Sequence, residues 1–205
     1  IREYLLSEAM YYLKISTARS LALVKFDEII LREKEVPAAI VTRVAKSHIR
    51  IGTFEYFYAR NDLNNLKKLA DYAINRHFPI YNNHKDKYIY LLRSVIKLQA
   101  DLVSDWMSVG FIHGVMNTDN VTISGQTIDY GPCAFMDEYE SNKCFSYIDQ
   151  RGRYSFFNQK HIILWNLIKF AEAILQLIDN DIKKSIKVAG KELDKFKNIF
   201  EKIYL

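Results

Sequence analysis

Three oxygen-bearing side chains lie close together in the stretch HGVMNTDNVTISGQTIDYG, residues 113–131. Asp119 and Asn120 are adjacent, and Asp129 follows nine residues after Asn120. Carboxylate and amide oxygens are hard ligands of the kind Mg²⁺ takes in nucleotide sites, usually one or two carboxylates together with phosphate oxygens. Asn and Asp also favour turns, so each residue taken alone would be read as a turn former. Their joint spacing makes a metal and phosphate site the better interpretation.

The spacing resembles the metal-binding end of kinase-like phosphotransferases. Those proteins carry a His, a catalytic Asp two residues later, an Asn seven residues after the His, and then a short hairpin ending in Asp-Phe-Gly or a relative of it. Here His113 and Asn120 keep that separation and Asp129 begins Asp-Tyr-Gly, but Val115 occupies the place of the catalytic Asp. We expect His113 to orient the loop from beneath rather than to transfer a proton. The stretch therefore predicts a site that keeps its metal ligands and lacks the usual base.

Two arginines form a second candidate constellation. Arg43 ends a predicted strand, and Arg50 follows seven residues later across a Ser-His turn. A guanidinium offers a planar fork of donors and stays charged, so two of them converging from a strand and a loop would suit a polyphosphate. Spacing alone leaves the alternative open that both are ordinary surface arginines.

The elements that must position these side chains are mostly helical. Apolar periodicity predicts a helix over 2–14, a helix over 63–77 that ends before Pro79, and a long helix from a cap at Asp86 to Val109. It also predicts a mostly buried helix over 161–178 and an amphipathic helix from Ile182 to Ile203, weakened at Gly190. Strands are expected over 20–24 and 38–44, with a candidate third strand between them, and a small hairpin over 121–130 turns at Ser124-Gly125. We expect one α+β, mostly α, domain over 1–205.

Composition excludes several classes of protein. Of the 205 residues 49% are hydrophobic, and only 3 are Pro and 7 Gly, which indicates a packed interior rather than disorder. The net charge of +5 is spread along the chain without a dense Lys/Arg block, so we expect no nucleic-acid partner. The two cysteines have no zinc-site spacing, and no run reaches the roughly 18 apolar residues of a membrane span, so we expect no membrane partner.

Longer stretches identify a family. GFIHGVMNTDNVTISGQTIDYGPCAFMDEY, TRVAKSHIRIGTFEYF, REYLLSEAM, RGRYSFFNQ and LWNL resemble the selenoprotein O (SelO) family, pseudokinases that are protein adenylyltransferases. The resemblance runs from Arg2 to about Leu167. It implies a kinase-like fold in which this chain is an internal fragment, beginning at the helix-C equivalent and including the large lobe. The nucleotide-covering N-terminal region of the family has no counterpart in the chain.

The resemblance also implies a reaction. The family binds ATP in a flipped orientation that exposes the α-phosphate, and it transfers AMP to Ser, Thr or Tyr hydroxyls of proteins. By motif, Asp129 resembles the main metal ligand, Asn120 the second, and Asp119 the proposed base. Arg43 and Arg50 match the pair that holds the terminal phosphates. With ATP reversed, the acceptor hydroxyl need not lie at the position of the usual base.

Other implications of the resemblance concern partners and regulation. Glu3 resembles the helix-C Glu that pairs with a Lys on a preceding strand, and Cys144 stands where some members have a cysteine that pairs with a C-terminal tail. The family implies ATP, Mg²⁺ (Mn²⁺ as the alternative metal) and protein substrates, in the cytoplasm of a bacterium or the mitochondrion of a eukaryote. Two other functions stay open: γ-phosphoryl transfer, against which Val115 counts, and a non-catalytic nucleotide-binding scaffold.

Overall fold

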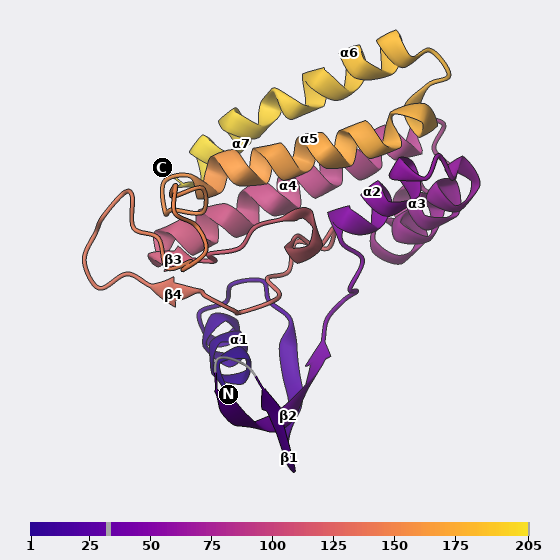
Figure 1. The fold of residues 1–205 in the computed structure, drawn as a ribbon. Coiled ribbons are helices and arrows are strands. Elements are labelled where there is room, and N and C mark those ends of the chain that lie inside the picture. Colours follow the sequence, from indigo (N-terminus) through magenta and orange to yellow (C-terminus); the bar gives the residue numbers. More distant parts are fainter. Residues whose placement is uncertain (32–33, 205) are drawn as a thin grey trace.

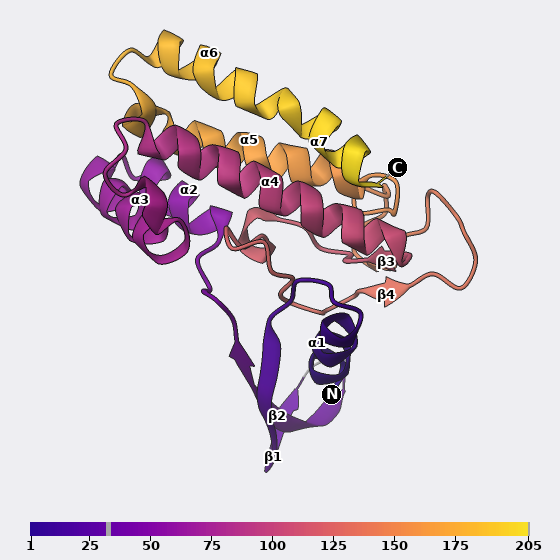
Figure 2. The same cartoon turned by 180° about the vertical axis from the view of Figure 1, so that it is seen from behind.

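Two long helices, α4 (Lys87–Ser108) and α5 (Gln159–Ile178), lie side by side at the centre of the computed structural model, which describes residues 1–31 and 34–204 (Figure 1). Four more helices pack around them: α2 (Ile51–Ala59), α3 (Leu63–His77), α6 (Ile182–Leu193) and α7 (Lys195–Tyr204). The C-terminal pair, α6 and α7, covers one side of α4 and α5, and α2 and α3 lie at one end (Figure 2).

The central helices form because their apolar residues repeat at the spacing of one helix face. Along α4, Leu91, Val95, Leu102 and Trp106 are all buried. Within the described residues only α5 has the length and composition to cross a membrane, with a mean hydropathy of 1.4 over its window. A core helix has the same composition, and α5 packs against α2, α4 and α6.

A β-ribbon with one helix lies beside the helical layer. β1 (Arg19–Leu31) pairs antiparallel with β2 (Glu35–Val44), and α1 (Arg2–Tyr12) packs on β1. The ribbon and α1 hang below the helices in Figure 1. The expected third strand is wrong: residues 25–31 continue β1, because the antiparallel pairing extends beyond the short apolar run that the pattern marked.

The predicted hairpin over 121–130 is also wrong as a regular hairpin. Only an isolated antiparallel bridge joins Val121 and Thr127, although Gly125 turns there with φ 66°. Thr127 pairs with Val121 and also with the segment after α1. It forms a parallel bridge to Thr17, and its N–H donates to the Ser16 carbonyl at 3.0 Å. The small regular sheet nearby is β3 (Phe111–Ile112) with β4 (Ala134–Phe135).

Most predicted helices are confirmed, with differences at their ends. α1, α3, α4 and α5 agree with the predicted ranges within a few residues, and Asp86 is the N-cap of α4 although its side chain makes no capping hydrogen bond. The last predicted helix is two helices, α6 and α7, which separate at Asp194 and not at Gly190. α2 was missed, because nine residues rich in aromatic and β-branched side chains carry little helical signal. Two short 3₁₀ turns complete the elements, η1 (Pro79–Tyr81) and η2 (Thr118–Asn120).

Candidate functional site

Glu3 joins α1 to two other segments. Its Oε1 accepts from Arg43 Nε at 2.9 Å and from Arg43 Nη2 at 2.6 Å. Its Oε2 accepts from the backbone N–H of Tyr130 at 2.7 Å. Arg43 Nη2 also lies 3.8 Å from Asp129 Oδ1. The structure therefore brings together Glu3, Arg43 and Asp129, which are far apart in the sequence.

Asp129 has a backbone conformation that few residues adopt. Its φ is 65°, in the left-handed region, and its carbonyl accepts from the N–H of Gly131 at 2.9 Å. Asp and Asn tolerate this region better than other non-glycine residues because their short polar side chains form local hydrogen bonds. The side chain of Asp129 is half-exposed, at 48%, next to the Glu3–Arg43 pair. A carboxylate held this way is accessible to a ligand from solvent.

His113 supports the Asp129 loop from inside the protein. It is buried, and its Nε2 donates to the carbonyl of Ile128, at 2.8 Å. The backbone N–H of Val115 donates to its Nδ1 at 3.4 Å. Burial lowers the pKa of His113 below its ordinary value, which fits a neutral ring with one donor and one acceptor nitrogen. This arrangement suits a residue that orients the loop.

Asn120 lies in η2, and its amide nitrogen forms a hydrogen bond to the backbone of the same loop. Its Nδ2 donates to the Val115 carbonyl at 3.0 Å, so Val115 contributes its backbone where the kinase pattern has a catalytic side chain. Within residues 1–31 and 34–204, no hydrogen bond engages Asn120 Oδ1. The amide therefore keeps its carbonyl oxygen, the atom that a hard cation binds.

The segment around Arg50 is paired to the residues that follow Asn120. The Ile51 N–H donates to the Val121 carbonyl at 2.9 Å, and the Ile123 N–H donates to the Ile49 carbonyl at 3.1 Å. An antiparallel bridge between Arg50 and Thr122 lies between these two hydrogen bonds. The start of α2 is thus held against the loop that carries Asn120.

Arg43 and Arg50 both lower the pKa of the same residue, His48. The pKa of His48 is lowered by burial and further by the positive charges of Arg43 and Arg50. The two arginines differ in their contacts. Arg43 is bound by Glu3, whereas the Arg50 guanidinium makes no hydrogen bond or ion pair with the residues that the structure describes. Arg50 is the arginine of the pair whose donors are free for a ligand.

Asp119 is exposed, beside Asn120 in η2, and its carboxylate lies against Gly52 in the first turn of α2. Gly52 was not predicted as part of the site, because nothing in the local pattern links it to Asp119. The contact depends on the backbone pairing between α2 and the loop after Asn120.

The predicted ligands offer oxygen atoms, which suit Mg²⁺ better than a transition metal. No group of three or more His, Cys, Asp and Glu residues converges anywhere in the described part of the chain. The predicted ligand pair, Asp129 and Asn120, offers one carboxylate and one amide oxygen. Mg²⁺ is commonly bound by one or two protein ligands and completed by substrate phosphates and water, so a sparse oxygen set is compatible with it.

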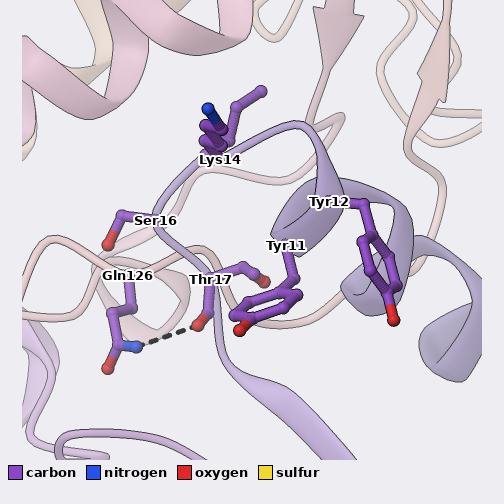
Figure 3. Close-up of a pocket in the computed structure, with 7 residues that line it drawn as sticks. Tyr11, Tyr12, Lys14, Ser16, Thr17 and Gln126 are labelled. Atoms are coloured by element: carbon purple, nitrogen blue, oxygen red, sulfur yellow. Dashed lines mark hydrogen bonds between the residues drawn. The ribbon is translucent and has the colours of Figure 1, made fainter.

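A separate hollow of ≈ 520 Å³ lies at the end of α1 (Figure 3). It is lined by side chains of the segment after α1 and by Gln126, whose Nε2 donates to the Thr17 carbonyl at 2.8 Å. Tyr11 and Tyr12 border it from α1 (Figure 3). None of the predicted site residues lines this hollow.

Both cysteines are free thiols. Cys133 is buried, and burial raises its pKa to about 12. Cys144 is partly buried, its Sγ lies 3.4 Å from Asp149 Oδ2, and burial raises the pKa of the thiol. A raised pKa makes the reactive thiolate form of Cys144 scarcer.

Comparison with known proteins gives one consistent result. The family model described as protein adenylyltransferase SelO matches residues 1–205. The chain is 54% identical over 205 residues to the protein nucleotidyltransferase YdiU of Bacillus cytotoxicus, and 52% identical over 202 residues to the protein of the same name from Bacillus cereus strain B4264. These matches cover 100% and 98% of the chain but 42% and 41% of those proteins. The chain therefore spans about two fifths of the length of these relatives.

Proposed function

The chain belongs to the SelO family of protein adenylyltransferases, and we propose that its full-length parent transfers AMP from ATP to Ser, Thr or Tyr hydroxyls of proteins. One observation carries the proposal. Glu3 binds Arg43 beside Asp129, and backbone pairing holds Arg50 next to the loop of Asn120. These contacts support a site in which Arg43 and Arg50 would bind phosphate, and Asp129 and Asn120 would bind the metal.

The fold we propose is kinase-like, with α1 as the helix-C equivalent and the larger helical layer as the large lobe of one domain. Glu3 lies on α1 and contacts the Asp-Tyr-Gly loop through the Tyr130 N–H, as this assignment requires. In the parent, a Lys from the preceding region would pair with Glu3.

Asp129 and Asn120 would hold Mg²⁺, with Mn²⁺ as the alternative. The ion supplies neutralising charge on the phosphate oxygens. Asp129 offers a half-exposed carboxylate, and Asn120 offers an oxygen because its nitrogen is bound to Val115. His113 keeps the Asp129 loop in place through the Ile128 carbonyl.

The arginines would bind the β- and γ-phosphates. Nucleotidyl transfer depends on in-line positioning and on stabilising the charge of the leaving pyrophosphate. Among the described residues the guanidinium of Arg50 has no partner and is free for this purpose, and both arginines lie near enough to His48 to lower its pKa. A flipped ATP held in this way would present its α-phosphate to the acceptor.

Asp119 would act as the general base for the acceptor hydroxyl. It is exposed, whereas Val115 has no side chain that can take a proton. A base must come within hydrogen-bond reach of the hydroxyl it deprotonates. Asp119 is exposed one residue before Asn120, the proposed metal ligand, so an acceptor hydroxyl could approach it from solvent.

The test uses the full-length parent with Mg²⁺ and a protein acceptor, in parallel reactions with α-labelled and γ-labelled ATP. AMP transfer predicts α-label in the acceptor and none from the γ-position. Intact-mass analysis of the parent after the same incubation would show an AMP adduct if it modifies itself. Label from the γ-position alone would replace this proposal with kinase activity.

One observation favours a second candidate, a non-catalytic nucleotide-binding scaffold. Arg43 is neutralised by Glu3, as a site that no longer performs transfer could tolerate. ATP binding without either label in the acceptor would select this alternative. For either function we propose ATP and proteins as partners, and no nucleic acid or membrane. We propose that the protein is located in the cytoplasm of a bacterium or in the mitochondrion of a eukaryote.

A further inference from the structure

The Asp119 carboxylate occupies space that any side chain at position 52 would need. A Cβ built on Gly52 would lie 2.2 Å from Asp119 Oδ1 and 3.2 Å from Asp119 Cγ. The next atom, the backbone carbon of Thr118, would be 3.4 Å away, an ordinary contact. The conflict therefore involves the carboxylate and not the backbone of the loop.

The backbone conformation does not explain a glycine at this position. Gly52 is the second residue of α2 and is not among the glycines with positive φ, which are Gly110, Gly114, Gly125 and Gly152. Gly is less favourable than Ala inside a helix. What Gly52 provides is space for its neighbour.

The surrounding backbone cannot easily give way. Hydrogen bonds from Ile51 to Val121 and from Ile123 to Ile49 hold the start of α2 against the loop on both sides of Arg50. The Asn120 N–H also donates to the Asn117 carbonyl at 2.9 Å, which closes the turn that contains Asp119. A methyl group on residue 52 would therefore move the Asp119 side chain, which is the flexible part of the contact.

We infer that Gly52 is a positioning residue for Asp119: by lacking a side chain, it lets the carboxylate rest on the first turn of α2. The inference rests on the proposed function, because Asp119 is its general base. Gly52 acts only through Asp119 and touches no reacting atom. The contact would limit the rotamers of an otherwise exposed carboxylate and hold it ready for the acceptor hydroxyl.

The experiment compares Gly52→Ala with Gly190→Ala in the full-length parent. Gly190 is the matched control, because it also lies in a helix and a Cβ there would meet nothing within 4 Å. Transfer is measured with both α- and γ-labelled ATP, together with KM for ATP and thermal stability. Gly52→Ala should lower kcat on the order of 100-fold, as expected for a misplaced base, with KM for ATP nearly unchanged. Its melting temperature should not fall, since Ala is the better helix former. Gly190→Ala should have the kcat and the KM for ATP of the wild type.

A double-mutant cycle with Asp119→Asn separates positioning from a general structural effect. If Gly52 acts through Asp119, Gly52→Ala should cause no further loss in the Asp119→Asn background. Full transfer by Gly52→Ala, or an equal additional loss in that background, would overturn the inference. If the wild type transfers only the γ-label, the proposed function fails, but the same cycle measured on that label still decides the role of Gly52. A wild type that transfers neither label would overturn both.

Discussion

The carboxylate of Glu3 and the guanidinium of Arg43 form an ion pair of 2.6 Å that ties α1 to β2. The two side chains are only 21% and 23% exposed, so the pair is partly shielded from water. Glu3 also accepts from the Tyr130 N–H, which links the pair to the Asp129 loop. One carboxylate thus controls both the availability of Arg43 and the position of the loop.

Glu3→Ala should destabilise the protein more than Glu3→Gln. Alanine leaves the Tyr130 N–H without its acceptor and Arg43 without its charge partner, whereas glutamine keeps an acceptor oxygen. The loss for Glu3→Ala should be about 1–3 kcal/mol in free energy of unfolding, measured by denaturant titration of the parent. In a double-mutant cycle, Glu3→Ala and Arg43→Ala should be less than additive. Strict additivity would show that the pair contributes nothing.

Asp129→Asn should remove transfer activity and leave the fold intact. Asn tolerates the left-handed backbone at this position nearly as well as Asp, but it lacks the negative charge that a metal ligand supplies. The rate should fall on the order of 100-fold or more. Asp129→Ala should lose the same activity and also about 1–2 kcal/mol of stability, because alanine is strained at positive φ.

The measurement for Asp129 is the initial rate of AMP transfer beside the melting temperature. Asp194→Asn is the control, since Asp194 is exposed between α6 and α7 and far along the chain from the site. Near wild-type transfer by Asp129→Asn would remove Asp129 from the metal site.

Arg50→Ala should reduce transfer while Arg60→Ala should not. Both arginines flank α2, but the Arg60 guanidinium stacks on the Tyr56 ring at 3.6 Å, while that of Arg50 is free in the described structure. Loss of one transition-state donor typically costs about 100-fold in kcat. Excess Mg²⁺ should not restore the rate, because guanidinium contacts to phosphate are directional. Equal rates for the two variants would leave Arg50 as an ordinary surface residue.

The buried His113 should make stability depend on pH. Burial lowers its pKa in the folded protein, whereas the unfolded chain takes up the proton near pH 6.5. Below about pH 6.5 the unfolded state therefore binds more protons, so the free energy of unfolding falls as the pH drops toward the folded-state pKa. Above about pH 6.5 the contribution of the neutral, buried His113 to the free energy of unfolding is fully present.

His113→Gln should reduce the slope of the free energy of unfolding against pH by about 1.4 kcal/mol per pH unit at most. The measurement is the free energy of unfolding of the parent at several pH values between 4.5 and 7. His48 and His77 also have lowered pKa values, but they contribute to both proteins, so the difference between wild type and variant isolates His113. Parallel curves would contradict the expectation.

Local sequence determined the residue chemistry and most of the helices. The helix over 63–77 agrees with α3 at both ends, because its apolar period and the proline that follows it are local features of the chain. The spacing from His113 to Asp129 and the family follow from contiguous residues in the same way. Such features depend on neighbours along the chain, so a single sequence suffices to predict them.

Tertiary structure alone decided which of these residues meet. The sequence predicted a phosphate role for Arg43 but not the contact of its guanidinium with Glu3 from another element. The expected regular hairpin does not form, because Thr127 pairs with the segment after α1 as well as with Val121. Gly52 receives the Asp119 carboxylate only because the start of α2 is paired with the loop after Asn120. These contacts join residues far apart in sequence, and their geometry depends on how whole elements pack, which no local periodicity encodes.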